Sequence, residues 1–237
     1  MKKILLSVLA LVSLLYASCQ MQEPESGKLT GEVEFRITAG IPTAITTYAD
    51  GVEAFSHQGG TSNLKPEEYT LRYILQVFDK EGKVAYEEVK NPDEGTFGGV
   101  TFKARLLAKK YDFVFWADFV KEDGTEFYNV GNSTDGYDLK NITYKKEGIT
   151  ISDLASDAAD AYTKVMEVDL TQSSQTLSEP VKLQRPFGKI RLLATDALGG
   201  NNKQEERPGE VTVDFKDAVI PSAFNALVQK VAEGATM

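Results

Sequence analysis

Apolar and polar residues alternate along most of this chain of 237 residues. Within residues 29–38, LTGEVEFRIT, the apolar side chains that share one face are Leu29, Val33, Phe35 and Ile37. Successive side chains of a strand point to opposite faces of a sheet, so a spacing of two predicts a half-buried β-strand. A helical period is almost absent from the chain, and the pattern as a whole predicts an all-β protein.

Short links join the predicted strands as antiparallel neighbours. Residues 69–78, YTLRYILQVF, repeat the alternation, and DKEGK follows as a turn in which Gly82 is available for a positive φ. KVAYEEV is the return strand of this hairpin, and VTFKARLLA, YDFVFWADF and FYNV come next, again with short links. This connectivity predicts a sandwich or barrel. The side chains expected on its inward faces include Val33, Phe35, Tyr73, Leu75, Phe113 and Phe115.

Fewer strands are predicted in the second half of the chain. A short helix is expected within residues 152–162, SDLASDAADAY, and the strand TKVMEVDL follows it. Further on, Pro186 interrupts an otherwise long strand, as proline does at strand edges and bulges. We place a domain boundary before this strand, between a β-sandwich domain of residues 29–180 and a second β domain of residues 181–237. The second domain has two clear strands in 57 residues, too few for a core of its own, so we expect it to be incomplete.

The first 18 residues have the features of a secretory signal. Lys2 and Lys3 precede an apolar run over residues 4–16, and Ala17-Ser18 supply small residues at a cleavage point. The run is too short to span a bilayer, which takes about 20 apolar residues. We therefore expect residues 1–18 to be absent from the mature protein.

The one cysteine, Cys19, lies directly behind this signal. Cleavage by an ordinary signal peptidase would leave an unpaired thiol in an oxidising compartment. Cleavage before Cys19 by a lipoprotein peptidase would consume the thiol in a thioether to diacylglycerol, and a fatty acid such as palmitate would cap the new amino terminus. The segment resembles a bacterial lipobox, with Tyr16 where that pattern has Leu, which favours lipidation at Cys19. Residues 19–28 are polar, acidic and proline-containing, as a flexible tether from an outer membrane would be.

The charge balance argues against nucleic acid as a partner. Loss of Lys2 and Lys3 with the signal lowers the number of basic residues from 26 to 24, against 35 acidic ones, and the net charge becomes −11. A surface this acidic repels phosphate groups, whereas nucleic-acid binding relies on clustered Lys and Arg.

Catalytic and metal-binding patterns are scarce, and we expect neither an enzyme nor a cofactor. The one histidine, His57, has no nucleophile motif beside it, and a zinc site needs several His or Cys ligands. Asn132, Asp135 and Asp138 offer oxygen ligands for calcium, but they lack the EF-hand spacing and its closing glutamate. A solvated turn is the interpretation that we favour for this loop, and we expect no metal site.

Trp116 leaves two interpretations open. It falls out of phase with Phe113 and Phe115 in YDFVFWADF, so it shares the other face of that strand with Asp118. On an exposed face, Trp116 with Tyr137 and Tyr144 would form a platform for a sugar ring, as in a glycan-binding lipoprotein of a nutrient-uptake system. The interpretation that we favour is that a second layer, or the second domain, covers this face, because large aromatic side chains are mostly buried.

The segments YDFVFWADFV, RPFGKIRLLATD and VIPSAFNAL, together with the lipobox-like start, resemble the fimbrillin family of surface lipoproteins from anaerobic Gram-negative bacteria. The resemblance implies tandem transthyretin-like β-sandwich domains. It also implies a structural subunit or anchor of a fimbria on the outer membrane, whose partners are other fimbrial subunits.

In that family a trypsin-like protease removes an N-terminal strand, and a strand from the next subunit replaces it. The resemblance therefore makes residues 29–38 the removable strand and Lys28 and Arg36 the candidate cleavage positions. It also implies further strands after VIPSAFNAL, and we expect this chain to be a poor strand donor that can still be an acceptor.

Overall fold

The computed structural model describes residues 31–42, 64–132, 134–145, 157–171, 175–176, 179–187 and 222–231. It contains fourteen strands and one 3-10 helix within these ranges. The elements are β1 (Glu32–Gly40), β2 (Tyr69–Phe78), β3 (Val84–Lys90), β4 (Val100–Leu107), β5 (Lys110–Lys121), β6 (Tyr128–Asn129), β7 (Gly131–Asn132), β8 (Gly136–Tyr137), β9 (Ile142–Tyr144), η1 (Asp157–Ala159), β10 (Ala161–Asp169), β11 (Gln175–Thr176), β12 (Val181–Lys182), β13 (Ala223–Asn225) and β14 (Lys230–Val231). The predicted all-β class is confirmed.

The central sheet has the strand order β10-β5-β2-β3, and all its pairs are antiparallel. The predicted hairpin of β2 and β3 is present, and Gly82 in its turn has a φ of +77°. A β-bulge lies between Val77 and Phe78. Long alternating segments thus form long central strands, and these define the plane on which the other layers pack.

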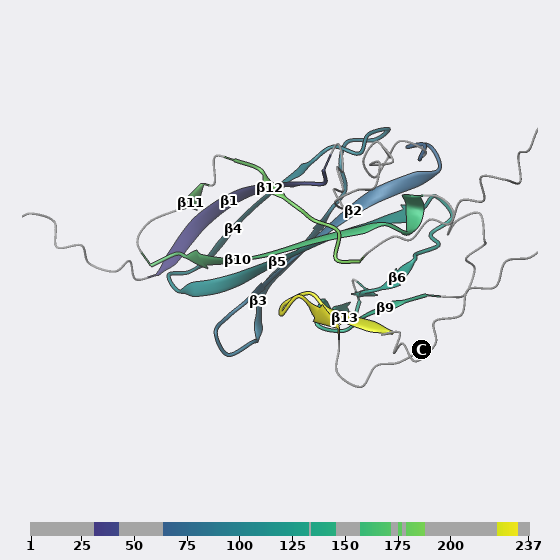
Figure 1. The fold of residues 1–237 in the computed structure, drawn as a ribbon. Helices are drawn as coiled ribbons and strands as arrows, with labels where there is room; N and C mark the ends of the chain where they lie inside the picture. Colours follow the sequence, from purple (N-terminus) through teal and green to yellow (C-terminus); the bar gives the residue numbers. More distant parts are fainter. Residues whose placement is uncertain are drawn as a thin grey trace, which may run out of the picture.

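The cover sheet consists of β1, β4, β11 and β12, and it lies over one face of the central sheet (Figure 1). β1 pairs with β4 in antiparallel register from Glu32 to Ala39. β11 and β12 pair with β1 in parallel. Parallel partners differ from the antiparallel connectivity that the short links predict. They require a long crossover, which here is the chain between β1 and β11.

The back sheet has the order β14-β13-β9-β6 and covers part of the opposite face of the central sheet (Figure 1). Both of the outer sheets contain residues from beyond position 180: β12 belongs to the cover sheet and β13 to the back sheet. Leu183, Phe224 and Ala226 are part of the same buried core as β1 and β5. The described residues after the expected boundary at residue 181 therefore share the core of those before it, while residues 188–221 lie outside the described ranges.

Burial follows the predicted phase and extends beyond it. The six side chains expected to point inward, Val33, Phe35, Tyr73, Leu75, Phe113 and Phe115, are all buried. In β2 and β5, however, the alternate positions are buried as well, because the cover sheet and the back sheet close both faces. Within the stretch expected to be helical, residues 157–159 form one 3-10 turn and β10 starts at Ala161.

Candidate strand-binding site around the first strand

The strand predicted at residues 29–38 is an interior strand of the cover sheet. β4 pairs with one edge of β1 over almost its whole length. The other edge of β1 pairs with β11 at Phe35 and Arg36 and with β12 at Ala39 and Gly40. We call the space that β1 occupies between these partners the β1 slot. Main-chain groups line both of its long sides, and the central sheet forms its floor.

The inward side chains of β1 fill the floor of the slot. Val33, Phe35, Ile37 and Ala39 are all nearly inaccessible to solvent, with exposed fractions between 0% and 4%. The Phe35 ring makes T-shaped contacts with Phe113, at 4.9 Å between centroids, and with Tyr86, at 5.7 Å. Aromatic pairs in this geometry add to the energy of burial alone, so Phe35 contributes more to holding the strand than an aliphatic side chain of similar burial would.

The outward side chains of β1 make only surface contacts. Glu34 forms an ion pair with Lys103 of β4 at 3.3 Å, and the Thr38 hydroxyl lies 2.8 Å from the Thr101 hydroxyl. Arg36 is exposed between them, as the alternation predicts. The slot therefore recognises one face of its strand, while the other face is free to vary.

A buried tyrosine holds the end of β1. The Tyr73 hydroxyl accepts a hydrogen bond from the backbone N–H of Ile41 at 3.2 Å and donates one to the carbonyl of Gly98 at 3.1 Å. Burial raises the pKa of Tyr73 to about 12, so the hydroxyl keeps its proton at neutral pH. On the other edge, the N–H of Leu183 donates to the carbonyl of Gly40 at 3.0 Å.

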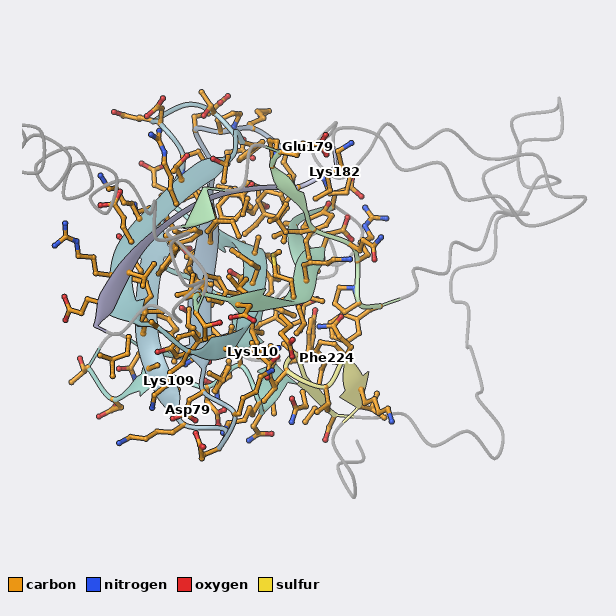
Figure 2. All side chains as sticks on the ribbon, turned by 90° about the vertical axis from the view of Figure 1, so that its left-hand side faces the viewer. Asp79, Lys109, Lys110, Glu179, Lys182 and Phe224 are labelled. Carbon is orange, nitrogen blue, oxygen red and sulfur yellow. The ribbon has the colours of Figure 1, made fainter. Side chains whose placement is uncertain are left out.

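The slot runs along the molecule between two distinct ends. Glu32 pairs with Leu107 at the beginning of β1, just before the turn at Lys109 and Lys110, and Gly40 pairs with Lys182 at its end. Figure 2 labels Lys109 and Lys110 in the lower part of the molecule and Lys182 in its upper part. The two ends of the slot are thus formed by residues from different parts of the chain.

The candidate cleavage residues occupy different environments. Lys28 and Cys19, the predicted site of lipidation, lie outside the described residues. Arg36 is in the middle of β1, where it pairs with Lys103 on one edge and with Thr176 on the other. A protease binds its substrate as an extended strand with free edges, so Arg36 becomes a substrate only after β1 leaves the slot.

The residues of the predicted sugar platform do not share an exposed face. Trp116 is fully buried beneath the back sheet, with Tyr128 at 5.3 Å and Phe224 at 6.4 Å between ring centroids. Tyr144 is half-buried and packs edge-on against Tyr128, while Tyr137 is half-buried in the short hairpin strand β8. The second interpretation of Trp116, burial under another layer, is the one that the structure supports.

The loop that suggested calcium is a hydrogen-bonded turn. The side-chain oxygen of Asn132 accepts hydrogen bonds from the backbone N–H groups of Thr134 and Asp135, the pattern of an Asx turn. Within the described ranges, no group of three or more His, Cys, Asp or Glu residues is placed to hold a metal ion. The same ranges contain no helix of the length and apolar character needed to span a membrane. His57 lies outside them.

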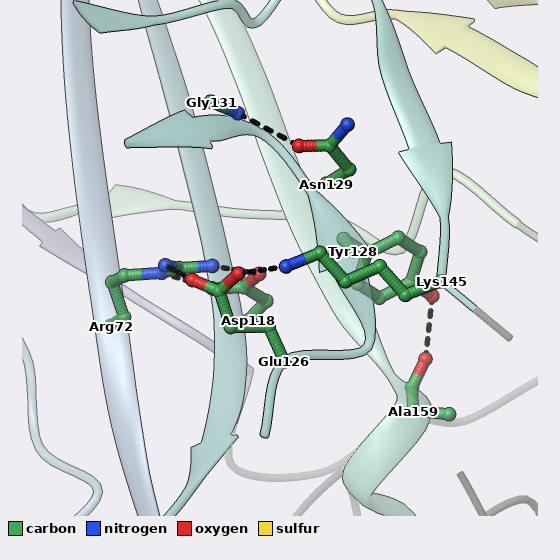
Figure 3. A network of polar contacts seen from close by, with 8 residues as sticks. All are labelled: Arg72, Asp118, Glu126, Tyr128, Asn129, Gly131, Lys145 and Ala159. Atoms are coloured by element: carbon green, nitrogen blue, oxygen red, sulfur yellow. Dashed lines mark hydrogen bonds and ion pairs between the residues drawn. The ribbon is translucent and has the colours of Figure 1, made fainter. Parts of the chain in front are cut away.

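A buried ion-pair network, which the sequence analysis missed, joins the central sheet to the back layer (Figure 3). Arg72 of β2 donates to both carboxylate oxygens of Asp118 on β5, at 2.9 and 2.8 Å, and to Glu126 at 2.5 Å. Lys145 pairs with the other oxygen of Glu126. The sequence did contain a sign of this network, because Arg72 and Asp118 are opposite charges within two largely apolar strands. A charged side chain in such a strand is rarely buried without a partner of opposite charge.

The network shifts the pKa values of Arg72 and Glu126 toward their charged forms. Burial by itself lowers the pKa of Arg72, but Asp118 and Glu126 outweigh it, and the pKa is raised. Burial by itself raises the pKa of Glu126, but Lys145 and Arg72 outweigh it, and the pKa is lowered. These ion pairs join Arg72 and Asp118 of the central sheet to Glu126 and Lys145 of the chain around the back sheet.

Residues 26–237 match the model of a protein family described as a family of unknown function, DUF6562. No curated protein matches the chain. One solved structure that it matches is a protein of Bacteroides thetaiotaomicron, provisionally named as polysaccharide-binding. It has 16% sequence identity and a TM-score of 0.37, and the match covers 65% of this chain and 47% of that one.

Two other matches are named for fimbriae or adhesion. The tip fimbrial protein Mfa3 of Porphyromonas gingivalis, with a C-terminal truncation, has 15% identity and a TM-score of 0.36 over 66% of this chain and 49% of that one. A protein of Parabacteroides distasonis, provisionally named a cell adhesion protein, has 12% identity and a TM-score of 0.40 over 65% and 46%. The chain spans about half the length of these structures, and scores this low carry no functional argument.

Proposed function

We propose that this chain, which belongs to DUF6562, a family of unknown function, is a structural subunit of a cell-surface fimbria that accepts a strand from another subunit in the β1 slot. One observation carries the proposal. β1 is an interior strand of the cover sheet, paired on both edges, and it buries Val33, Phe35, Ile37 and Ala39 against the central sheet. A strand in this position can be replaced only by another strand of the same pattern.

The physical mechanism is β-augmentation. Departure of β1 would leave the N–H and C=O groups of β4 and of β11 and β12 unpaired, on either side of an apolar floor. Unpaired edges and exposed apolar surface together favour the addition of a new strand. The incoming strand would run in the direction of β1, antiparallel to β4 and parallel to β11 and β12.

The slot also limits how β1 can be released. Cleavage at Lys28 would leave β1 in place, and the sequence between Arg36 and Lys65 holds no Lys or Arg. Under the proposal, β1 first opens from the slot, and a trypsin-like protease then cuts at Arg36; residues 37–42, still joined to β2, must stay out of the slot for an incoming strand to fill its whole length. Opening and not cleavage is then the step that controls exchange.

The start of the chain supports a surface location. Under the proposal, Cys19 carries the lipid, residues 19–28 act as the tether to the outer membrane, and the described sheets stand outside it. The working part is then a groove for a strand, and no enzymatic chemistry is required. Sugar binding is less well supported, because the burial of Trp116 removes the central residue of the platform.

The test is exchange of β1 in the mature chain. A recognition site for a specific protease is placed within residues 43–63, between β1 and β2, and the chain is cut there so that β1 is held only by the slot. A labelled peptide of residues 29–42 is then added in excess, with a peptide of the same composition in scrambled order as control. We expect the first peptide to co-elute with the protein and the scrambled one to elute separately. If neither peptide is retained while circular dichroism shows a folded protein, the proposed function is wrong.

A further inference from the structure

The last inward position of β1 differs from the other three. Val33, Phe35 and Ile37 are large, whereas position 39 holds an alanine with no exposed surface. Ala39 pairs with Val100 on one edge and with Val181 on the other, so it lies inside the sheet, and its side chain points into the closed core. Interiors are packed too densely to admit extra methyl groups without strain, and this position therefore fits only a small side chain.

A close backbone approach lies beside this position. A Cβ atom at Gly99 would lie 2.6 Å from the carbonyl oxygen of Ala39, a distance that real Cβ atoms do not adopt. Glycine at position 99 thus allows the chain before β4 to touch the end of β1. Directly next to this contact, the Tyr73 hydroxyl joins the N–H of Ile41 to the carbonyl of Gly98.

We infer that this end of the β1 slot is a register stop: the fully buried inward position of Ala39 admits only an alanine-sized side chain, and the Tyr73 hydroxyl requires a free backbone N–H two residues later. The Tyr73 hydroxyl accepts a hydrogen bond from the backbone N–H two residues after the Ala39 position. The strand therefore cannot have proline there, because proline has no N–H. This role rests on the proposed function, because it concerns strands that replace β1. Tyr73 acts as a positioning residue, since it touches the backbone of the strand from the opposite sheet.

The stop would exclude every shifted register. A shift of one residue turns the apolar face outward. A shift of two residues in one direction places Ile37 in the alanine position and Val33 in the Phe35 position, which combines overpacking with a cavity. A shift of two residues the other way places Ile41 in the alanine position. The partner that the slot takes is therefore a strand of the pattern aromatic-x-apolar-x-Ala, or Gly in place of Ala, with a free N–H two residues later.

The experiment uses the cut protein described above and a series of labelled peptides of residues 29–42. The Ala39→Val peptide should bind about tenfold more weakly than the natural one, and the Arg36→Ala peptide, altered on the exposed face, should bind equally. A peptide with a methyl group on the backbone nitrogen of Ile41 should bind about fivefold more weakly, because it lacks the hydrogen bond to Tyr73. Equal binding of the Ala39→Val and natural peptides would overturn the inference.

A Tyr73→Phe variant of the protein completes a double-mutant cycle. Its slot should bind the natural and the methylated peptide equally, because the hydroxyl that distinguishes them is gone. A fivefold preference that persists in Tyr73→Phe would show that the methyl group acts by another route and would also overturn the inference. If the cut protein retains the natural, Ala39→Val and methylated peptides equally well, the register stop is wrong but the proposed function stands. If it retains no peptide, the proposed function itself is wrong.

Hydrogen exchange in the intact chain gives a readout that does not depend on strand replacement. In Tyr73→Phe, the Ile41 amide should exchange about tenfold faster, while the amides in the middle of β1 keep their rates. Unchanged exchange at Ile41 would mean that Tyr73 does not hold this end of the strand.

Discussion

The two faces of the central sheet are closed in different ways. On the face toward the cover sheet, β1 packs through apolar contacts such as that of Phe35 with Phe113. The buried residues of β1 include no charged side chain. Toward the back sheet, Arg72 and Asp118 are buried along with Trp116. The same two strands, β2 and β5, supply both faces, because their side chains alternate.

Under the proposed function, this difference indicates which layer would be replaced. Apolar contact has little directional preference, so a strand of similar shape can take the place of β1. A buried ion pair depends on its particular partners, since removal of one leaves the other charged and unpaired in the interior. We therefore expect strand exchange to be confined to the cover face, while the back layer stays in place.

The largest effect is expected from breaking the back face. Asp118→Ala would leave Arg72 buried with Glu126 as its remaining described ion-pair partner, and should lower the free energy of unfolding by about 4 kcal/mol. Urea titration followed by tryptophan fluorescence measures this change. The control is Lys80→Ala, which removes surface ion pairs with Asp112 and Glu167 from the same sheet and should shift the midpoint little. Equal shifts for the two variants would mean that the buried network adds nothing.

The next largest effect is expected on the cover face. Phe35→Ala would remove the ring that packs on Phe113 and Tyr86 and should lower the free energy of unfolding by about 3 kcal/mol. The matched control is Arg36→Ala, the neighbouring exposed position of the same strand. In addition, Phe35→Ala should speed replacement of β1 by the labelled peptide, whereas Asp118→Ala should not. Faster replacement in both variants would contradict the division between the two faces.

Acid should weaken the back face in particular. The pKa of Glu126 is lowered in the folded protein, so its carboxylate contributes stability above the unfolded pKa of about 4.3. That contribution is lost as the pH falls below about 4 and through the lower folded pKa. We expect the unfolding midpoint to fall over this range, and less steeply in Glu126→Gln. Identical pH profiles for the two proteins would mean that Glu126 is not coupled to Arg72 and Lys145.

The smallest effect is expected at the surface of the cover sheet. Glu34 and Lys103 form an ion pair with both side chains well exposed, and such pairs contribute less than about 1 kcal/mol. Lys103→Ala should therefore change the free energy of unfolding by about 0.5 kcal/mol or less, and 0.5 M salt should remove the difference. If Lys103→Ala lowers the free energy of unfolding by nearly as much as Phe35→Ala, the outward face of β1 also helps to hold this strand in the sheet.

The sequence alone located the four strands of the central sheet and the pair β1 and β4 of the cover sheet. The segment YTLRYILQVF corresponds to β2, Tyr69–Phe78, residue for residue, and the alternation in residues 29–38 identified β1 and the face that it buries. These predictions succeed because the spacing of two is a local property of an extended chain, and because apolar side chains must leave water on whichever face they share.

Only the tertiary structure decided what lies beside and above these strands. The parallel pairing of β1 with β11 and β12, the burial of Trp116 and the meeting of Arg72 with Asp118 join residues that are far apart in the chain. No local period encodes such pairings, because they depend on which layer closes each face of the sheet. The strand predicted from alternation ended at Thr38, and only the structure placed Ala39 on the inward face, beside the approach of Gly99 and the Tyr73 hydroxyl.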